Sequence, residues 1–539
     1  MQCTHGQSPI PCGCAIPASF KSAILSRRNF LNAGLAASLS PAILSGCGAS
    51  SASVAVTTPT QNNWLIKNAT IYTADGSNTI IEGADMVVNN GLIQAVGKTG
   101  TLAAGANAQT IDATGHILFP GFINNHYHDI SAFRLDNYWS ANIDDRTTEQ
   151  DAIFSNGGDL VALNALAENY DLSKGLTPEE AYTIALYNYV GHLRNGTTTL
   201  GDVGGISEWN SMAQAALDMG IRCGPSIWGQ DAVLNASSGL VETTAARTDA
   251  LVRDFDDMLS KWSRHSSGRI RARPSMLIPT SSSDAFISQL GGLSRRYDTP
   301  FVMHAGALRN EQDVSQQFYG KRSIQRLADN GVLNQRLTTV HTAYITDAER
   351  LQLLAAKVNV DHAPAKYGFG GEPTVSETKQ LTRFLAEGGN LAVSTDGDAV
   401  PLAHMISAMQ AASIMHNEAN ANNIAVLPSK VLEMATRNPA KAMLWDSEIG
   451  SIEVGKKADF SLIKADDWRY AAVRRQLSAF LANGGVGDVK HVFVDGKQLV
   501  RDGEMTMLDE KQLKRSYYLA MQSYTKRLLG VEYPLPPQI

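Results

Sequence analysis

Long blocks of a single charge are missing from this sequence. Its 46 lysine and arginine residues and its 52 aspartate and glutamate residues are interspersed, and they leave a formal net charge of −6. A protein that recognises the phosphate backbone carries a clustered basic surface, so nucleic acid is excluded as a partner. With 44% hydrophobic and 18% charged residues, the chain has the composition of an ordinary globular protein. Its length suits one large domain and a smaller one.

Cysteine is also scarce, and most of it lies near the N-terminus. Three of the five cysteines precede the export-signal cleavage point that we predict below, so the mature chain keeps Cys47 and Cys223. A framework of disulfides is therefore not expected. Short repeats of solenoid period and coiled-coil heptads are absent from the sequence as well.

The N-terminal segment lacks an apolar run long enough to span a membrane. Its apolar stretch, residues 30–44, is shorter than the roughly 20 residues that a spanning helix needs. The stretch follows Arg27 and Arg28 in RRNFL, which resembles the twin-arginine signal that directs export of folded proteins. A chance arginine pair before a tail is the alternative. We interpret residues 1–60 as a cleaved export signal with its spacer.

Cys47 adds a second possibility for this segment. It ends the sequence Leu44-Ser45-Gly46-Cys47, which resembles a bacterial lipoprotein box. In that interpretation Cys47 becomes the lipid-bearing first residue of a membrane-anchored protein, and in the other the signal is simply removed. Both interpretations predict a bacterial protein exported by the twin-arginine route, either periplasmic or anchored to a membrane.

Two β-rich flanks enclose a longer region in which strands and helices alternate. Segments such as WLIKNATIYTADG and VKHVFVDGKQLVRDG alternate apolar and polar residues between turns, which is typical of short antiparallel strands. From about 120 to 440, runs of strand length are each followed by a helical pattern, as in TTVHTAYI and TDAERLQLLAAKV. This order predicts parallel βαβ units and an α/β fold of the (β/α)8 barrel type.

The predicted organisation follows from this change of pattern. The two flanks, distant in sequence, are expected to form one small composite β-sandwich beside the barrel. The boundaries are 1–60 for the export signal with lipobox and spacer, 61–119 and 441–507 for the two parts of the sandwich, 120–440 for the barrel, and 508–539 for a C-terminal helix and tail.

Four histidines and one aspartate follow predicted barrel strands. His126 and His128 in FPGFINNHYHDI are two residues apart, so both imidazoles face the same side of a strand. His304 in FVMHAG, His341 in LTTVHTAY and Asp396 in GNLAVSTDGDAV each end an apolar run. Barrel active sites gather residues from the ends of several strands, so these groups are expected to meet. Taken singly, each histidine is alternatively a hydrogen-bonded structural residue, and Asp396 a helix N-cap.

The motifs resemble the amidohydrolase superfamily, in its deaminase and triazine-hydrolase branch, which includes proteins like atrazine chlorohydrolase and cytosine deaminase. PGFINNHYH is similar to the first-strand motif of that branch, LRNGTTTLGDV to its second-strand element, and TRNPAKAMLWDSEIGSIEVGKKADFSLI to its closing signature. The resemblance covers roughly residues 64 to 500. It implies a deformed (β/α)8 TIM barrel with a composite β-sandwich, and a metal-dependent hydrolase.

Carried over by position, the resemblance makes His126, His128, His304 and Asp396 the ligands of one divalent ion. Zinc is the first choice, with iron and manganese as alternatives. Such an ion lowers the pKa of bound water toward about 7. Asp396 is then the catalytic group that accepts the proton of the water, and His341 polarises the bond under attack. No lysine is placed like the carboxylated bridge of binuclear members, which favours a single metal.

The sequence departs from the family three residues after His304. Aminohydrolases of the branch carry a glutamate there, which protonates a heteroaromatic ring, but this chain has Ala307. Glu311, four residues further on, is a candidate substitute. Hydrolysis of an amide, urea, carbamate or ester needs no ring protonation, and neither does displacement of a halide. The loss of the glutamate therefore favours these reactions over deamination.

Two loops are candidates for substrate contacts. In VDHAPAKYGFGG the His-x-Pro element of the family survives, but its Ser-Asn is replaced by Lys366-Tyr367. Loops at this end of a barrel face the pocket, so Lys366 and Tyr367 are candidate specificity residues, unless they belong to a plain surface loop. The segment 134–174 follows the first barrel strand, and its Tyr138 and Trp139 are candidate apolar walls.

The sequence therefore predicts an exported metal-dependent amidohydrolase that cleaves a C–N bond of a small amide, urea or carbamate-like compound. The enzyme alternative is a heteroaromatic deaminase or dechlorinase acting on a triazine-like or pterin-like compound. A ligand-binding lipoprotein that has lost catalysis is the alternative of another class. The expected partners are a small-molecule substrate and, through Cys47, a membrane; a homo-oligomer is left open.

Overall fold

The structure is a computed structural model, and it describes residues 54–128, 175–204, 208–369, 372–397, 404–471 and 473–529. Residues 1–53 of the predicted export segment, which include Cys47, lie outside these residues. So do Tyr138 and Trp139, the two predicted apolar walls of the site.

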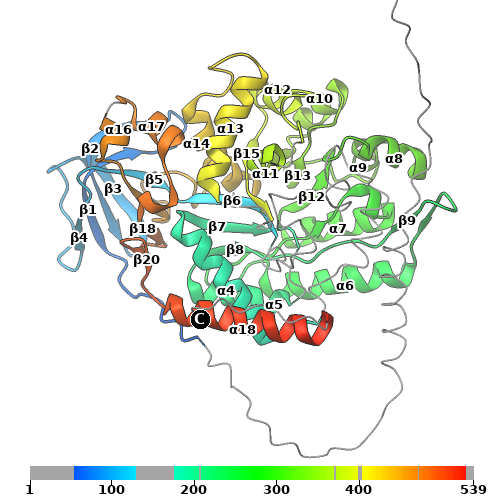
Figure 1. Cartoon of the computed structure of the whole chain (residues 1–539), viewed down its shortest axis with the longest axis horizontal. Helices are drawn as coiled ribbons and strands as arrows, with labels where there is room; N and C mark the ends of the chain where they lie inside the picture. The colour runs from blue at the N-terminus through cyan, green and yellow to red at the C-terminus, as the bar shows by residue number, and fades with distance from the viewer. Residues whose placement is uncertain are drawn as a thin grey trace, which may run out of the picture. The chain divides into compact units, whose positions relative to one another are not determined.

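Strands from both flanks of the chain form one sheet of nine strands (Figure 1). Its order is β20-β19-β18-β17-β5-β1-β2-β3, and β4 pairs with β1 off this path. The strands are β1 (Trp64–Tyr72), β2 (Ile80–Asn89), β3 (Leu92–Lys98), β4 (Gln109–Asp112), β5 (His116–Pro120), β17 (Phe460–Lys464), β18 (Val489–Val494), β19 (Lys497–Arg501) and β20 (Glu504–Met505).

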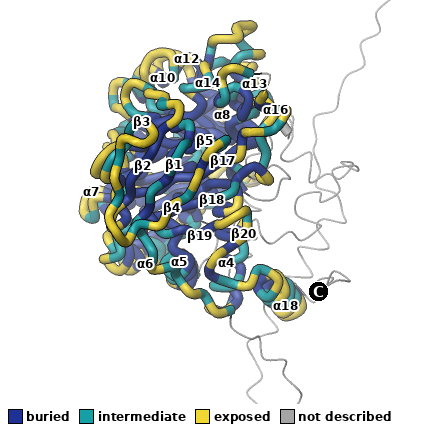
Figure 2. The backbone as a smooth tube through the Cα atoms, turned by 90° about the vertical axis from the view of Figure 1, so that its left-hand side faces the viewer, coloured by how far each residue is buried: buried dark blue, intermediate teal, exposed yellow. Residues whose placement is uncertain are grey.

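The junction of the two flanks is the antiparallel pair β5 and β17. Phe119 lies opposite Ser461 and Leu118 opposite Leu462, so residues about 340 positions apart share a ladder. Figure 2 shows the central strands β1, β5, β17 and β18 largely buried and the outer turns exposed. Both flanks thus contribute to one sheet, while the two-layer sandwich and the domain boundaries stay predictions.

Two parallel sheets occupy the region between the flanks, and they make the fold α/β as the sequence predicts. Each neighbouring pair of their strands runs parallel. One sheet has the order β11 (Ser275–Met276), β12 (Phe301–Ala305), β13 (Leu337–His341), β14 (Asn359–His362), β15 (Leu391–Val393), and the other β16 (Asp396–Gly397), β6 (Phe122–His128), β7 (Thr197–Asp202), β8 (Arg222–Gly224). A separate hairpin joins β9 (Val233–Asn235) to β10 (Leu240–Glu242).

Helices follow most of the parallel strands and begin where the sequence supplies caps. Thr177 and Glu180 form a capping box at the first of them, and Thr346 and Glu349 form another at α10. The helices are α4 (Pro178–Arg194), α5 (Trp209–Met219), α6 (Ala245–Trp262), η2 (Pro279–Ser281), α7 (Asp284–Tyr297), α8 (Glu311–Tyr319), α9 (Ser323–Asp329), α10 (Asp347–Ala355), α11 (Pro364–Phe369), α12 (Gln380–Ala386), α13 (Met405–Ala419), α14 (Pro428–Ala435), α15 (Arg437–Ala442), α16 (Trp468–Ala471), α17 (Gln476–Asn483), η3 (Val486–Asp488) and α18 (Glu510–Leu529).

The C-terminal helix α18 packs along α4, as Figure 1 shows. The rings of Tyr187 and Tyr517 stack with their centroids 4.0 Å apart. Arg527 pairs with Glu180 at 2.6 Å, so the capping residue of α4 also holds α18. Helix α18 therefore packs against the α/β region through α4.

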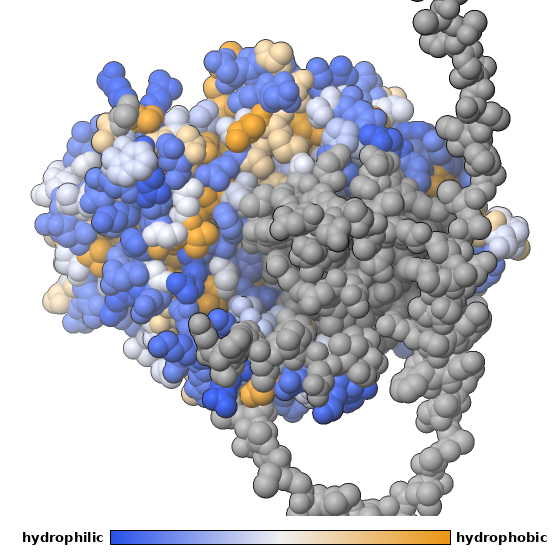
Figure 3. All heavy atoms as spheres, in the orientation of Figure 1, coloured by the Kyte–Doolittle hydropathy of each residue, from blue (hydrophilic) through white to orange (hydrophobic). Residues whose placement is uncertain are grey.

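The surface in Figure 3 is mainly hydrophilic, as the composition leads one to expect. A few large apolar side chains are nevertheless exposed, among them Trp468 at 82% and Ile414 at 66%. Within the described residues, no helix has both the length and the apolar character that crossing a membrane requires.

A buried arginine joins the nine-stranded sheet to the α/β region. Arg222 on β8 donates through Nε to Asp459 Oδ2 at 2.5 Å and through Nη2 to Asp495. Asp459 precedes β17, and Asp495 lies in the turn between β18 and β19. The Arg222 side chain is only 1% exposed, so its charge depends on these two carboxylates for neutralisation.

Replacement of Arg222 is expected to lower the stability of the fold. Arg222→Met leaves two carboxylates without their buried partner, which costs about 3–5 kcal/mol in the free energy of unfolding. Arg264→Met removes an exposed pair with Asp298 and serves as the control, with a loss below about 1 kcal/mol. Urea unfolding followed by circular dichroism measures both, and equal losses would contradict the role of Arg222.

Candidate metal centre

The ends of four parallel strands bring the predicted histidines and aspartate together. The ring nitrogens of His126, His128 and His304 include ligand atoms that all lie within 4.8 Å of one another, and ligand atoms of His126, His341 and Asp396 meet the same limit. His126 and His128 come from β6, His304 from β12, His341 from β13 and Asp396 from β16. The structure thus assembles all five residues that the sequence singles out.

Asp396 lies at the middle of this cluster. Its Oδ1 is 3.4 Å from Nε2 of His126 and 3.4 Å from Nε2 of His128. Its Oδ2 is 3.2 Å from Nε2 of His341. The backbone N–H of Gly397 donates to Oδ1 at 2.7 Å and fixes the orientation of the carboxylate. One carboxylate therefore faces three imidazoles at once.

Burial sets the protonation of the cluster. Loss of hydration lowers the pKa of His341 to about 4, and it holds the pKa values of His126 and His128 well below the usual range. Burial opposes ionisation of Asp396 as well, but the ammonium group of Lys366 and the adjacent ring of His126 keep the pKa of that carboxyl well below its usual range. The cluster therefore consists of neutral imidazoles and an ionised carboxylate at neutral pH.

Backbone carbonyls orient two of the imidazoles. Nδ1 of His128 lies 2.9 Å from the carbonyl oxygen of Gly204, and Nδ1 of His304 lies 2.6 Å from that of Leu277. A carbonyl only accepts, so Nδ1 carries the proton in both rings, and Nε2 keeps its lone pair. This is how metal-binding histidines are commonly held.

His341 and Asp396 adopt backbone conformations that side chains other than glycine rarely take. Their φ angles are +67° and +60°, in the left-handed region. Both residues stand at or near the end of a short strand, where the turn redirects the chain. Such strain persists only where the surrounding structure enforces it, and it is common at functional sites.

A divalent metal ion fits this donor set. His126 and His341 are buried, and neither ring nitrogen of either residue has a hydrogen-bond partner among the described residues. Buried polar atoms are normally satisfied, so nitrogens left over beside an ionised carboxylate indicate a cation ligand. Imidazole nitrogens with one carboxylate oxygen suit zinc and similar borderline ions. His126, His128, His304 and Asp396 are the residues that would hold it.

A buried arginine supports the strand that carries two of these histidines. Arg273 donates through Nη1 to Asn125 Oδ1 and through Nη2 to the Asn125 carbonyl, both at 2.6 Å. Asn125 directly precedes His126 on β6, and its neighbour Asn124 donates to Thr395 at 2.7 Å, next to Asp396. The polar layer beneath the cluster therefore couples the positions of His126 and Asp396.

The predicted specificity residues both reach the cluster. Nζ of Lys366 lies 2.7 Å from Asp396 Oδ2. The ring of Tyr367 lies 4.3 Å from the ring of His341, centroid to centroid, and burial raises the pKa of the Tyr367 phenol well above its usual range. The two residues on α11 thus belong to the site rather than to a plain surface loop.

The Glu311 side chain points back toward Ala307, the position at which the family carries its glutamate. It is the first residue of α8, fully buried, and its Oε2 accepts a hydrogen bond from the N–H of Ala307 at 2.8 Å. Burial raises the pKa of this carboxyl. The carboxylate is therefore engaged by the backbone of the loop that follows β12.

Two further residues of this region escaped sequence analysis. The Trp228 ring lies 5.4 Å from that of His128, centroid to centroid. Glu372, to which the sequence analysis assigns no role, is 8% exposed, and burial raises the pKa of its carboxyl to about 7. The Glu372 N–H donates to the Tyr367 carbonyl at 2.8 Å, which ties it to α11. Neither residue carries a motif, and only their position beside the cluster identifies them.

A chain of hydrogen bonds leads from His362, in the predicted His-x-Pro element, toward α13. Nε2 of His362 lies 3.1 Å from Nε2 of His416, and Nδ1 of His416 lies 2.7 Å from Oγ1 of Thr382. Asn420 Nδ2 donates to Thr382 Oγ1 at 3.1 Å and to the His416 carbonyl at 2.8 Å. Both imidazoles are buried.

The direction of these bonds fixes both histidine tautomers. Thr382 Oγ1 accepts from Asn420, and among the described residues its hydroxyl proton has no acceptor other than Nδ1 of His416, so we assign Thr382 as the donor to that nitrogen. Neutral His416 then carries its proton on Nε2 and donates it to Nε2 of His362. His362 consequently carries its proton on Nδ1, an atom without a partner among the described residues.

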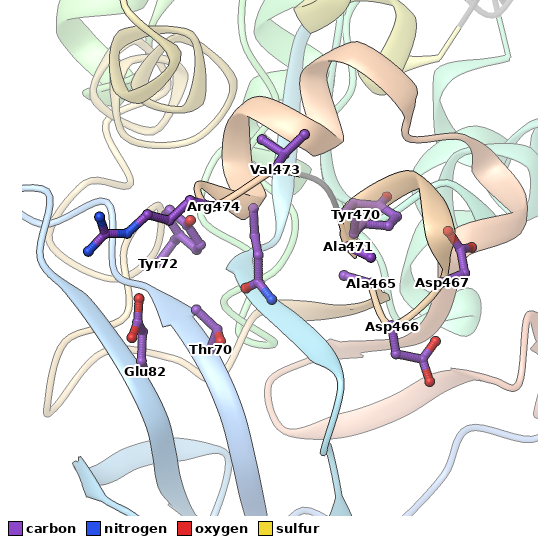
Figure 4. Close-up of a pocket in the computed structure, with 11 residues that line it drawn as sticks. Thr70, Tyr72, Glu82, Ala465, Asp466, Asp467, Tyr470, Ala471, Val473 and Arg474 are labelled. Atoms are coloured by element: carbon purple, nitrogen blue, oxygen red, sulfur yellow. The ribbon is translucent and has the colours of Figure 1, made fainter.

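A separate cavity of about 390 Å³ lies between the nine-stranded sheet and the α16–α17 segment (Figure 4). Among its lining residues, Glu82, Asp466 and Asp467 supply carboxylates and Arg474 a guanidinium. None of the five clustered residues lines it, and it contains no histidine. This cavity is therefore distinct from the candidate metal centre.

Comparisons with known proteins agree with the site. The profile of the Amidohydrolase family matches residues 117–499. A 5-methylthioadenosine/S-adenosylhomocysteine deaminase of Thermoanaerobacter pseudethanolicus is 26% identical over 457 residues, covering 84% of this chain and 96% of that protein. A 5'-deoxyadenosine deaminase of Methanosarcina mazei is 25% identical over 469 residues, covering 86% and 99%.

Solved structures share the fold. An adenosine deaminase from Xanthomonas campestris with bound zinc matches with a TM-score of 0.73 at 21% identity, over 87% of this chain and 99% of that one. An atrazine chlorohydrolase from Arthrobacter aurescens complexed with zinc matches with a TM-score of 0.72 at 20% identity, over 85% and 99%. At such identities the likeness concerns the fold alone.

The α/β fold and its buried histidine–aspartate cluster define a metal-dependent hydrolase. The chain belongs to the Amidohydrolase family, so the resemblance drawn from the sequence is confirmed. It is a hydrolase of carbon–nitrogen bonds other than peptide bonds.

The tautomers of His362 and His416 are open to direct measurement. We expect ¹⁵N-histidine spectra to show His416 protonated on Nε2 and His362 on Nδ1, with His362→Asn and His416→Asn providing the assignments. Because burial lowers the pKa of His416 to about 4, its signals should stay constant between about pH 5.5 and 8.

Thr382→Val removes the hydroxyl that donates to His416 and should move the His416 resonances, whereas Thr183→Val on α4 should leave them unchanged. A His416 ring protonated on Nδ1 in the unaltered protein would contradict the assignment.

Proposed function

We propose that this chain hydrolyses a C–N bond of a small amide, urea or carbamate-like compound, with zinc as the first choice of metal and iron or manganese as alternatives. One observation carries the choice of reaction: the five-residue cluster is complete, while the position of the ring-protonating glutamate holds Ala307, which is buried and has no acidic group. A carbonyl substrate needs the cluster but not that acid.

The hydrogen bond of Glu311 supports the same choice. Its carboxylate already accepts from the Ala307 N–H, and to protonate a ring it would have to give up this contact while remaining buried. Loss of a charge-assisted hydrogen bond in a buried setting costs about 1.5–3 kcal/mol. Hydrolysis of a carbonyl compound avoids this cost.

Asp396 and His341 have different roles in such a reaction. A divalent ion held by this donor set would activate water at neutral pH and polarise the bond under attack. Asp396, facing both the ligand imidazoles and His341, accepts the proton of the attacking water and passes it to the leaving nitrogen. His341, neutral and fixed by its strand end, holds the substrate carbonyl beside Asp396.

Deamination of a heteroaromatic amine is the second candidate. The relatives named as deaminases favour it, and so does the position of Glu311, whose carboxylate lies 2.8 Å from the backbone of Ala307. In this alternative Glu311 supplies the proton that a glutamate at 307 would give. The two candidates differ in whether Glu311 is needed for turnover.

A substrate screen with metal-replete enzyme tests the proposal. Amides, ureas, carbamates, aminopurines and chloro-triazines are offered together, and products are identified by mass. We expect turnover of a carbonyl compound, loss of activity after chelation, and recovery with zinc, iron or manganese.

Glu311→Gln separates the two candidates. It should retain activity within about tenfold on a carbonyl substrate, since Gln can still accept from Ala307, but it should lose about 100-fold or more on a ring that needs protonation. Ammonia release from aminopurines alone would favour the second candidate. Metal-replete protein inert toward every class would favour ligand binding without catalysis.

We further propose that the two parallel sheets are the two parts of one deformed (β/α)8 barrel. The segment before β11 continues the ladder of β8, because Arg271 N–H donates to the Cys223 carbonyl at 3.0 Å and Cys223 N–H to the Arg269 carbonyl at 2.9 Å. At the other side, β15 and β16 are separated by only two residues. These links support a continuous wall, with the composite sheet at its side.

Export is a proposal that rests on the sequence alone. Arg27, Arg28 and the Leu44–Cys47 box support a protein carried out of the cytoplasm by the twin-arginine route, either released or lipid-anchored at Cys47. In a bacterial host, Arg27→Lys with Arg28→Lys should retain the full chain in the cytoplasm. Cys47→Ala should release the protein from membranes if Cys47 is lipidated; unchanged fractionation of the double variant would contradict export.

A further inference from the structure

We propose that Trp228 is a specificity-determining residue, and that the substrate carries a flat conjugated group beside its scissile C–N bond that packs on the indole ring. The proposal rests on the function proposed above and narrows its substrate class. It concerns amides, ureas and carbamates that bear an aromatic ring on the acyl carbon or on the nitrogen, in contrast to purely aliphatic ones.

Trp228 stands beside one of the predicted metal-binding histidines. Its ring lies 5.4 Å from the ring of His128, centroid to centroid, and the two ring planes are tilted by 54°. Nε2 of the same histidine faces Asp396 Oδ1 at 3.4 Å. The indole is therefore one ring away from the candidate metal-binding atoms, so the part of a substrate next to its reacting carbonyl lies within its reach.

The indole borders the accessible side of the cluster. Trp228 and His304 are both partly exposed, and the His128 side chain is 8% exposed. The side chains of His126 and Asp396, at 0% and 3%, are closed off from solvent. The His128 and His304 rings lie nearly parallel, 5.5 Å apart. A ligand that approaches the cluster from solvent therefore passes these two rings, with Trp228 at its flank.

Close backbone contacts on two sides fix the position of Trp228. Gly204 has a φ angle of +100°, and a Cβ there would lie 2.6 Å from Cα of Trp228. A Cβ on Gly229 would collide with the Ser275 carbonyl oxygen, and Leu277 N–H donates to the Gly229 carbonyl at 2.8 Å. Only glycine allows these approaches. The indole is thus held in place before a ligand binds, which reduces the entropy that binding costs.

Trp228 has no role in the hydrophobic core. It belongs to none of the apolar clusters of the described residues, although its neighbour Ile227 packs against the largest of them. Trp64 and Trp262 donate their indole N–H groups to other residues, whereas that of Trp228 has no acceptor among the described residues. A large aromatic side chain that is fixed in place without packing in the core is typical of a binding surface.

The chemistry of the neighbouring groups leaves the apolar contact to Trp228. The cluster consists of imidazoles and a carboxylate, which bind polar atoms, and the ring of Tyr367 lies against His341. The face of an indole instead favours a flat apolar group, which stacks on it and is removed from water together with it. The cluster therefore takes the carbonyl end of the substrate, and Trp228 selects the group attached to it.

Titration of the metal-replete enzyme with acetophenone and with cyclohexyl methyl ketone tests this proposal. The two probes share one carbon skeleton, but only acetophenone is flat and conjugated, and ligand-observed NMR gives both dissociation constants. We expect acetophenone to bind about fivefold more tightly, and Trp228→Leu to weaken acetophenone about fivefold with little change for the other ketone. Trp228→Phe keeps an aromatic face and should stay within about twofold of the unaltered enzyme.

The indole N–H signal locates the bound probe. In ¹⁵N-tryptophan spectra, the Trp228 signal is the one missing from Trp228→Phe, and acetophenone should shift it in proportion to saturation. Trp468→Leu is the matched control, because it removes a tryptophan that is 82% exposed on α16. It should change the affinity for neither ketone.

Metal content and circular dichroism accompany each variant. Equal affinities of the unaltered enzyme for the two ketones overturn the proposal, and so does Trp228→Leu with full metal content and an unchanged preference for acetophenone. If Trp228→Leu does not fold, Trp228→Met replaces it. A Trp228 signal that saturating acetophenone leaves unmoved overturns the proposal by itself.

The outcome is separable from that of the proposed function, because neither ketone contains a C–N bond and the result does not depend on turnover. A preference for acetophenone that depends on Trp228, in an enzyme that cleaves no amide, urea or carbamate, would overturn the function and leave the role of Trp228 standing. Cleavage of aliphatic and aromatic amides with equal kcat/KM, together with equal ketone affinities, would do the reverse.

Discussion

The buried carboxylate of Asp396 determines which charged groups must surround it in this site. Asp396 is ionised at a position that is almost closed to solvent, where an isolated negative charge would be very costly. Positive charge must therefore lie beside it, and the described residues supply it through Lys366. The nearby ligand atoms of the histidines are also close enough together to hold a divalent ion. The neutral histidines cannot provide this charge, because burial prevents their protonation.

Backbone carbonyls and one buried arginine keep these groups in place. Carbonyl oxygens of Gly204 and Leu277 hold two rings, and Arg273 holds the strand that carries His126. Strand ends in left-handed conformations aim His341 and Asp396 at the same point. A site built in this way has little freedom to relax when one group is removed, so its members depend on one another.

The five clustered residues were predictable because each stands at a strand end, a position that the apolar runs mark in the sequence. His126 and His128 share a face through the two-residue period of a strand, and the barrel rule brings the other strands beside them. No comparable pattern in the sequence indicates which side chains of distant elements contact each other. The pairing of His362 with His416 spans 54 positions, and the direction in which Glu311 turns depends on which backbone N–H groups are unpaired.

The pairing of β5 with β17 also affects how the protein folds while it is being synthesised. The strands at the N-terminal end are synthesised first, and β5 can pair with β1 on one side, yet its partner on the other side, β17, appears only after the whole α/β region has been translated. Until then, the apolar residues Leu118 and Phe119 lie on an open sheet edge, which invites pairing with other chains. During synthesis this protein therefore depends on shielding of that edge, by a chaperone or by slow local association, and a chain cut short before β17 would be the form most prone to aggregate.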